Sequence, residues 1–437
     1  MSMERLLAQI PDYQAFLTVD EINAELRKLA EDYPKTVQVF EAGVSRAGSP
    51  ILCARIGDGQ RKALFYGCPH PNEPIGAMMS LYFARAIAAD DAYRRALGFT
   101  FLIIPVADVD GTRLNEGWFK GPFTLYEYAR HFFRPASADQ VEWSFPMDYK
   151  TYRFTDTMPE TRALMRIIDE EKPCFLYSLH NAGFGGAYWY LSHPQPEGLF
   201  KALHARAEAG GVPLDLGEPE MPYIERLYPA VYRMPCARDQ YDFLEKNVPG
   251  DPAAYMEGGE CSGAYAGADV QELVCELPYF FEPRVQSNRL LDFPRAEAIR
   301  QKLALEEAHY EALREAFAPV DQKLSPDNPF AKMLRQTLRF LPIAIQSERA
   351  FIENNPAFDA PCRESEAFSA IEMTRFYQLL NWGLLARCGE ATNAAAILEA
   401  EAEALEKALS YQVIPIRNLV AVQLASGLTL LEQMNRA

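Results

Sequence analysis

The middle of this chain alternates short apolar runs with segments whose apolar residues recur at helical spacing. Ala63 to Tyr66 and Phe99 to Ile104 are continuous apolar runs typical of buried strands, and Ile75 to Ile87 between them predicts a helix. The same alternation continues with expected helices at 161–171 and 198–210 and expected strands at 174–179 and 272–276. Strands buried on both faces and separated by helices predict an α/β fold, with a mixed or mostly parallel sheet covered on both sides.

The residues before this region predict a helix and a β-hairpin. Thr18 is followed three residues later by Glu21, which is typical of a helix start, and apolar spacing continues the helix to Tyr33. Val37 to Phe40 and Ile51 to Ile56 are rich in β-forming residues, and the Gly-containing and Pro-containing segment between them favours a hairpin.

After about Arg284 the strand patterns almost disappear. Apolar residues continue at helical spacing in five stretches, which are 299–317, 330–352, 365–385, 394–409 and 419–434. They predict a bundle of about four or five helices. The expected organisation is a catalytic domain over residues 1–290 and an all-α accessory domain over residues 291–437.

Composition excludes several classes of protein. The formal net charge of -17 argues against nucleic-acid binding and against anionic membranes, because phosphate contacts need clustered Lys and Arg. The eight cysteines form no Cys-x-x-Cys pair, no apolar stretch reaches membrane-spanning length, and the amino terminus lacks a signal-peptide pattern. A soluble cytoplasmic protein with reduced thiols is expected.

Polar residues at the ends of three expected strands indicate the chemistry. His70 and Glu73 follow one strand, His180 ends another and Glu276 ends a third, and strand ends of such a sheet converge on one crevice. Two imidazoles and one carboxylate form a three-ligand zinc site with an open fourth position. Glu276 beside it is suited to take a proton from water and pass it to a leaving amine. Taken alone, His70 and Glu73 would fit a chance pair on a solvated turn better than a metal site, because such short motifs recur by accident.

Six motifs then follow one another along the chain, and in this order they resemble the zinc metallocarboxypeptidases of the carboxypeptidase A type over roughly residues 12–284. They are Gly43-Val-Ser-Arg-Ala-Gly-Ser-Pro-Ile51, Gly67-Cys-Pro-His70-Pro-Asn-Glu73, Pro105-Val-Ala-Asp-Val-Asp110-Gly111, Pro159-Glu-Thr-Arg-Ala-Leu164, Ser178-Leu-His180 and Val274-Cys-Glu276-Leu. The resemblance implies an eight-stranded type of mixed sheet, one Zn2+ per chain held by His70, Glu73 and His180, and Glu276 as general base.

The resemblance also implies residues that handle the substrate. Tyr255, which precedes Gly258-Gly259 and stands about twenty residues before Glu276, matches a mobile Tyr that hydrogen-bonds substrate near the scissile bond. The family's Asn-Arg pair for the substrate carboxylate is altered, since Phe133 stands before Arg134. We expect Arg134 to bind the carboxylate and Arg113 to stabilise the oxyanion.

Glu260 and Cys261 follow the Gly-Gly pair, at the place where the family sets side-chain preference. Glu260 there would favour a basic substrate group, although a solvated loop carboxylate is an equally good interpretation.

The function expected from these residues is zinc-dependent hydrolysis of a peptide or amide bond, in first place by a carboxypeptidase acting on short or cell-wall peptides. A deacylase of N-acyl amino acids, similar to aspartoacylase and succinylglutamate desuccinylase, is one alternative. A non-catalytic binding protein is another. The helical region is expected either to cover the site and restrict substrates to small ones or to mediate association between copies of the chain.

Overall fold

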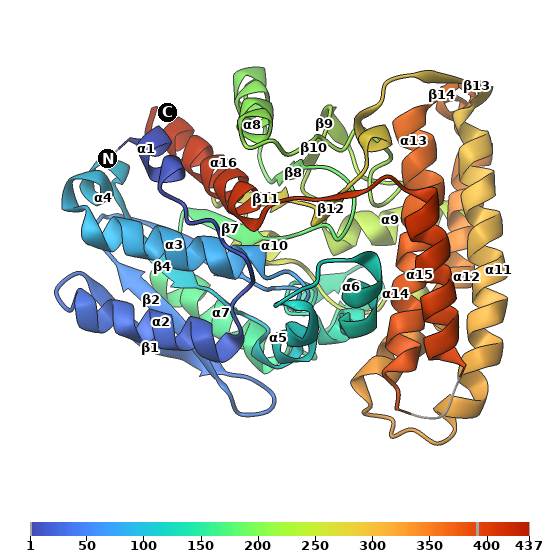
Figure 1. Cartoon of the computed structure of the whole chain (residues 1–437), viewed down its shortest axis with the longest axis horizontal. Helices are drawn as coiled ribbons and strands as arrows, with labels where there is room; N and C mark the ends of the chain where they lie inside the picture. The colour runs from blue at the N-terminus through green and yellow to red at the C-terminus, as the bar shows by residue number, and fades with distance from the viewer. Residues whose placement is uncertain (1, 390–392, 437) are drawn as a thin grey trace.

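The computed structural model describes residues 2–389 and 393–436, which form an α/β part and a helical bundle beside it (Figure 1). The strands of the α/β part make one nine-stranded sheet in the order β1-β2-β4-β3-β7-β11-β8-β10-β9. Their bounds are β1 Val37–Val44, β2 Pro50–Ile56, β3 Arg61–Gly67, β4 Phe99–Ile104, β7 Phe175–Leu179, β8 Tyr188–Leu191, β9 Arg226–Tyr228, β10 Val231–Arg233 and β11 Gln271–Glu276.

The expected mixed sheet is confirmed, but parallel and antiparallel pairs are equally frequent in it. The central strands β4, β3, β7 and β11 run parallel, whereas the β1–β2 hairpin and the β8, β9 and β10 strands bring antiparallel pairs to the two edges. The parallel centre matters for function, because the carboxyl ends of β3, β7 and β11 lie next to one another.

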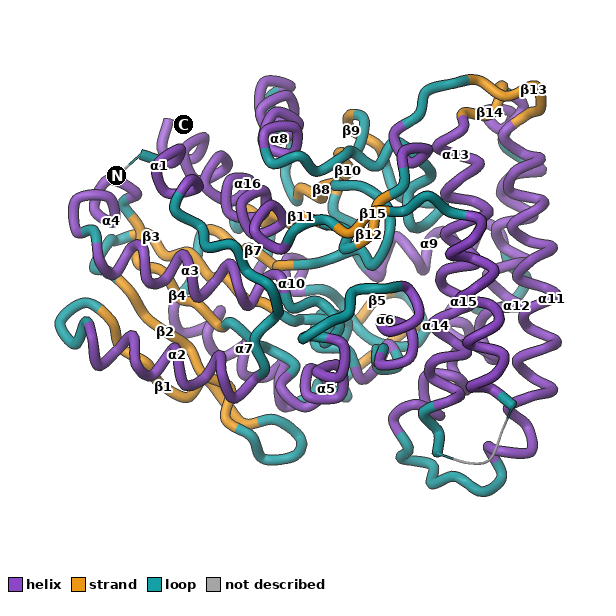
Figure 2. The backbone as a smooth tube through the Cα atoms, in the orientation of Figure 1, coloured by secondary structure: helices purple, strands orange, loops and turns teal. Residues whose placement is uncertain are grey.

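Side chains of the central strands alternate between two apolar clusters. In β3, for example, Ala63 and Phe65 belong to one cluster and Leu64 and Tyr66 to the other, as the two-residue period of a strand requires. Helices therefore cover both faces of the sheet, and Figure 2 shows the strands in orange between them. The helices of this part are α1 Met3–Ala8, α2 Val19–Asp32, α3 Ile75–Ala89, α4 Asp91–Leu97, α5 Val109–Asn115, α6 Leu125–His131, α7 Pro159–Glu171, α8 Glu197–Ala209, α9 Ala237–Asn247 and α10 Ser262–Ala266.

The predicted start of α2 is confirmed in detail. Thr18 caps the helix, its hydroxyl accepts from the backbone N–H of Glu21, and the Glu21 carboxylate accepts from the backbone N–H of Thr18 in return. Two short strands, β5 Met147–Tyr149 and β6 Tyr152–Phe154, form a separate ribbon within the long aromatic stretch between α5 and α7.

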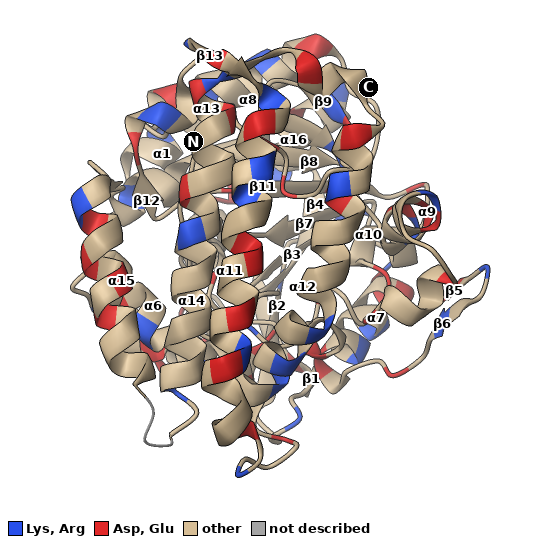
Figure 3. Cartoon of the chain, turned by 90° about the vertical axis from the view of Figure 1, so that its right-hand side faces the viewer, with Lys and Arg blue, Asp and Glu red and all other residues tan. Residues whose placement is uncertain are grey.

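The helical bundle consists of α11 to α15, and Figure 3 shows its long helices in front of the sheet, with acidic and basic residues interspersed along them. Pairing of β13 with β14 closes one end of it. The bounds are β13 Leu290–Pro294, α11 Arg295–Asp321, α12 Pro329–Glu353, β14 Pro361–Arg363, α13 Glu364–Phe368, α14 Thr374–Ala386 and α15 Ala394–Ala408.

The last helix, α16 Ile416–Arg436, packs on the sheet instead of in the bundle. It lies against α3 and α8, beside the amino-terminal helix α1 (Figure 1). Gly427 allows this close approach, because a Cβ there would lie 2.5 Å from the Tyr177 ring of β7. The chain leaves the α/β part through β12 Phe280–Phe281 and returns through β15 Gln412–Val413, and these two strands pair with each other.

All eight cysteines are free thiols. Within residues 2–389 and 393–436 we find no helix long and apolar enough to cross a membrane.

Candidate metal centre

The loop after β3 brings His70 and Glu73 to the carboxyl end of the sheet. Gly67 ends the strand where a Cβ would lie 2.5 Å from the Pro105 carbonyl oxygen, and Cys68 then takes a left-handed backbone conformation with φ of 48°. The carbonyls of both residues accept hydrogen bonds from the loop after β4, at 2.9 Å for Ala107 N and 3.0 Å for Asp108 N. This pairing fixes the turn that carries the two candidate ligands.

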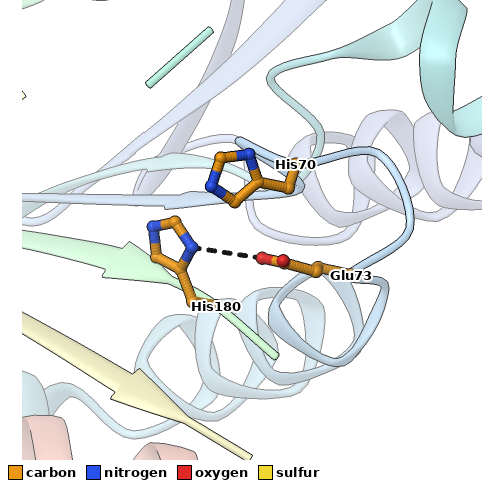
Figure 4. Close-up of side chains that lie close together, drawn as sticks. All are labelled: His70, Glu73 and His180. Atoms are coloured by element: carbon orange, nitrogen blue, oxygen red, sulfur yellow. Dashed lines mark ion pairs between the residues drawn. The ribbon is translucent and has the colours of Figure 1, made fainter. Parts of the chain in front are cut away.

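His180 follows β7, the neighbour of β3, so it lies opposite this turn. One ligand atom from each of His70, Glu73 and His180 lies within 4.8 Å of the other two, and Figure 4 shows the three side chains pointing toward one another. All three are buried, with 3%, 1% and 5% of their surfaces exposed. The structure thus brings together the three residues expected to bind metal.

The polar atoms of these residues fit a metal ion. His70 Nδ1 and Glu73 Oε2 are buried and have no hydrogen-bond partner, although Glu73 Oε2 lies 3.1 Å from His180 Nδ1. Unpartnered buried polar atoms are costly, and a shared cation would satisfy them. Burial, with the charges of Arg134 and His180, holds the pKa of His70 well below its ordinary value, so its ring is neutral and able to ligate. Two imidazoles and a carboxylate are zinc ligands.

The other nitrogen of His180 is held by a buried hydrogen-bond relay. Ser178 Oγ lies 2.7 Å from His180 Nε2 and donates to the Glu142 carboxylate at 3.1 Å. Because Ser178 uses its only hydroxyl proton to donate to Glu142, it must accept a hydrogen bond from His180 Nε2–H. The other nitrogen, Nδ1, then carries no proton, and its lone pair points toward Glu73. Tyr66 and Ser262 also donate to Glu142 and hold it in place.

Glu276, at the end of β11, faces the same space. Its Oε1 lies 3.7 Å from His180 Nδ1. Burial raises the pKa of Glu276 well above its ordinary value, and the charges of Glu73 and Glu220 raise it further. A buried carboxyl group beside the metal ligands is suited to accept and release a proton during a reaction.

Arg134 is the cation of the site. Its Nη1 lies 3.2 Å from Glu73 Oε1, and its backbone position is set by Asn115, whose side chain makes two hydrogen bonds to the backbone of Phe133 at 2.8 and 2.9 Å. The guanidinium therefore faces the metal ligands and can hold a carboxylate of a bound molecule.

The structure does not bring Arg113 to the site. Arg113 lies in the last turn of α5, where its guanidinium pairs with Asp20 of α2 at 2.6 Å on the protein surface. The expectation that Arg113 stabilises an oxyanion is corrected by this placement, because the helix directs the side chain away from His70 and Glu276.

The residues expected to contact the substrate do not lie in one cavity. Cys261 lines the metal cavity, whereas Tyr255 lines an adjoining cavity and its hydroxyl donates to the Pro249 carbonyl at 3.2 Å. Glu260 lines neither cavity, since its carboxylate accepts from Ala237 N at the start of α9 and pairs with Arg238. Glu260 in this arrangement caps a helix instead of meeting a substrate.

A cavity of about 500 Å3 surrounds the metal ligands, and helices of the bundle form its opposite wall. Met333 and Thr337 come from α12, and Phe376, Tyr377, Leu380, Asn381 and Leu384 come from α14. No local sequence pattern points to these residues or to Glu220, because none ends a strand or belongs to a motif. Glu142 and Trp143, which also line the cavity, belong to the long aromatic stretch between α5 and α7.

Comparisons with known proteins agree with the motifs. The family model described as zinc carboxypeptidase matches residues 22–195. Zinc carboxypeptidase A 1 of Anopheles gambiae is 29% identical over 126 residues, which cover 26% of this chain and 29% of that protein. The chain thus matches less than a third of the length of this curated relative.

Solved structures have lower sequence identity to this chain than the curated relative has. Carboxypeptidase A from Helicoverpa armigera has a TM-score of 0.39 at 18% identity, with 63% of this chain and 70% of that chain covered. A metallo-carboxypeptidase from Burkholderia cenocepacia has a TM-score of 0.35 at 16% identity, with 60% of each chain covered. The resemblance to zinc carboxypeptidases that the sequence motifs predict is therefore confirmed, by the family model, over residues 22–195.

Proposed function

We propose that this protein is a zinc-dependent hydrolase that cleaves the peptide or amide bond of a small substrate bearing a free carboxylate. The observation that carries the proposal is the buried set of His70, Glu73 and His180, with Glu276 and Arg134 facing the same cavity. Zinc bound there would activate water and polarise the scissile carbonyl.

The residues of the chain supply the proton transfers and the orientation. Glu276 accepts a proton from the attacking water as the new carbon–oxygen bond forms. It then gives a proton to the nitrogen as the carbon–nitrogen bond breaks, which yields a carboxylic acid product and a free amine. Arg134 holds the substrate carboxylate and so fixes which bond lies beside Glu276.

Removal of a C-terminal residue from a short peptide is the favoured reaction. Hydrolysis of an N-acyl amino acid is a second candidate, because such a molecule has the same amide and carboxylate. The bundle wall of the cavity favours compact substrates of either kind. A hydrolysis screen of free-carboxylate peptides, cell-wall peptides and N-acyl amino acids with zinc-loaded protein separates the two.

Glu276→Gln tests the proposed role of the base. We expect the variant to keep about one zinc per chain and to lose turnover by a factor on the order of 1,000 or more, since Gln cannot accept the proton. Glu272→Gln on the same strand is the matched control, because Glu272 is also a buried carboxyl but does not line the metal cavity. Substantial hydrolysis by Glu276→Gln contradicts the assignment. Failure of the native protein to bind zinc favours a non-catalytic binding protein.

A further inference from the structure

The cavity around the metal ligands continues into two adjoining cavities of about 310 and 530 Å3, and Glu220 borders all three. Glu220 lies in the segment between α8 and β9. Tyr190 of β8, next to the strand that carries Glu276, donates its hydroxyl proton to Glu220 Oε2 at 2.7 Å. This hydrogen bond holds the carboxylate at the meeting point of the cavities.

Some other carboxylates on these walls have cationic partners. Glu218 pairs with Arg295, and Glu348 pairs with Lys302 at 2.6 Å. For Glu220, in contrast, no Lys, Arg or His nitrogen of the described chain lies within the 4.0 Å that defines an ion pair. The charge of Glu220 therefore faces the cavity without a protein counter-ion.

The electrostatics of the metal cavity would be improved by a cation at this place. The exposed Glu220 and the buried Glu276 border the same space. Two carboxylates that border one cavity repel each other, and a positive group between or beside them relieves that repulsion.

The opposite wall offers an aromatic surface for such a group. Tyr377 of α14 lines the metal cavity and the smaller adjoining cavity, and 49% of its surface is exposed. The part of this side chain that the protein does not cover remains available to a bound molecule. Ammonium and guanidinium groups are attracted to the face of such a ring.

We propose that Glu220 binds an ammonium or guanidinium group of the substrate, so that the preferred substrates carry a basic group in addition to the carboxylate held by Arg134. The inference rests on the proposed hydrolase function and adds to it a substrate class and the residue that selects it. The cation comes either from the free amino terminus of a short peptide or from a basic side chain.

Four dipeptides separate these two sources: Gly-Lys and Gly-norleucine, each with a free and with an acetylated amino terminus. We expect kcat/KM of the native protein to be higher for peptides that carry the selected cation. Glu220→Gln should lower kcat/KM for those peptides about 10- to 100-fold more than for the acetylated Gly-norleucine peptide, which carries no cation. Glu225→Gln is the control, since Glu225 pairs with Arg233 on the surface and lines none of the three cavities.

Calorimetric binding of the same peptides to zinc-loaded Glu276→Gln, with and without Glu220→Gln, gives a readout that does not need turnover. Binding that depends on Glu220 without hydrolysis by the native protein overturns the proposed function and supports the cation site. Hydrolysis with equal effects of Glu220→Gln on all four peptides, or with no effect, overturns the cation site and leaves the hydrolase. If Glu220→Gln does not fold, equal affinities of Glu276→Gln for the four peptides overturn the inference, and tighter binding of the cationic ones supports it.

Discussion

Ser178 is fully buried and lines none of the three cavities, yet it decides which nitrogen of His180 is free to bind zinc. His180 Nε2 donates a hydrogen bond to Ser178 Oγ, and Ser178 Oγ donates one to the Glu142 carboxylate. Without the hydroxyl, the imidazole can rotate or take the other tautomer, and Glu142 loses one of its donors. A single buried oxygen thus links the metal centre to the carboxylate behind it.

Ser178→Ala should therefore weaken zinc binding about 10- to 100-fold, the range usual for loss of a residue that orients a metal ligand. Competition with a chromophoric chelator measures this affinity without any assay of activity. Ser80→Ala is a matched control, because the Ser80 hydroxyl in α3 is also buried but has no hydrogen-bond partner. An unchanged zinc affinity of Ser178→Ala would show that the relay does not orient His180.

At the same scale, the sequence predicts some residues of the site and misplaces others for physical reasons. His70, Glu73, His180 and Glu276 follow strands, and the topology of a mixed sheet with a parallel centre leads such residues to one edge. Arg113 lies in a short helix, where a rotation of one residue changes the direction of a side chain by about 100°. Local spacing therefore could not decide between the site and the Asp20 pair found on the surface.

The helices of the bundle show the same limit at the scale of elements. Their apolar periodicity predicts that they pack, and α11, α12 and α14 do pack together. Apolar periodicity shows which face of a helix is buried, but it does not show which other helix or strand that face packs against. For this reason the sequence could not show that α12 and α14 place Thr337 and Tyr377 in the metal cavity, or that α16 packs on α3 and α8.

A contact between α11 and α14 makes the stability of the bundle depend on pH. His309 of α11 is buried, its Nε2 lies 3.1 Å from Asn381 Nδ2 of α14, and burial lowers its pKa to about 4. An unfolded His has a pKa of about 6.5, so the unfolded state binds the proton first as the pH falls. Stability is therefore lost as the pH falls from about 6.5 toward 4.

Between pH 7 and pH 5, His309 should account for a loss of about 2 kcal/mol in the free energy of unfolding. Urea unfolding of the native protein and of His309→Gln at a series of pH values measures it, since the difference between the two proteins isolates this group from the carboxyls. His193→Gln, which removes an imidazole far along the chain in the segment after β8, serves as control. Parallel pH profiles for the native protein and His309→Gln would contradict the assignment.

For the whole molecule, the pairing of β12 with β15 changes how the chain is divided. Phe281 is opposite Gln412, so the chain leaves the α/β part and returns to it at neighbouring positions. Residues 282–411 are then an insertion, and α16 completes the sheet side of the molecule, where Gln423 Nε2 donates to the His180 carbonyl at 3.0 Å. Strands of two residues leave no readable pattern, which is why the sequence favours a single boundary near residue 290.

A matched pair of deletions tests this division. A chain that ends at residue 290 loses α16, whose buried aliphatic side chains are Ile416, Leu419, Val420, Val422, Leu424, Leu428, Leu430 and Leu431. At about 1.5 to 3 kcal/mol each, the loss of these eight side chains costs about 12 to 24 kcal/mol as an upper estimate, which is as large as or larger than the usual stability of a protein. The truncated chain should therefore fail to fold.

Replacement of residues 282–411 by an Asn-Gly turn keeps α16 and converts β12 and β15 into a hairpin, because a two-residue turn suits two strands whose ends already face each other. We expect this shorter protein to unfold cooperatively in urea and to bind zinc, although it loses the bundle wall of the metal cavity and with it Tyr377. Circular dichroism and chelator competition compare the two deletions. Equal folding of both proteins would show that α16 does not support the sheet, and failure of the internal deletion alone would show that the bundle, beyond covering the site, is needed for the α/β part to fold.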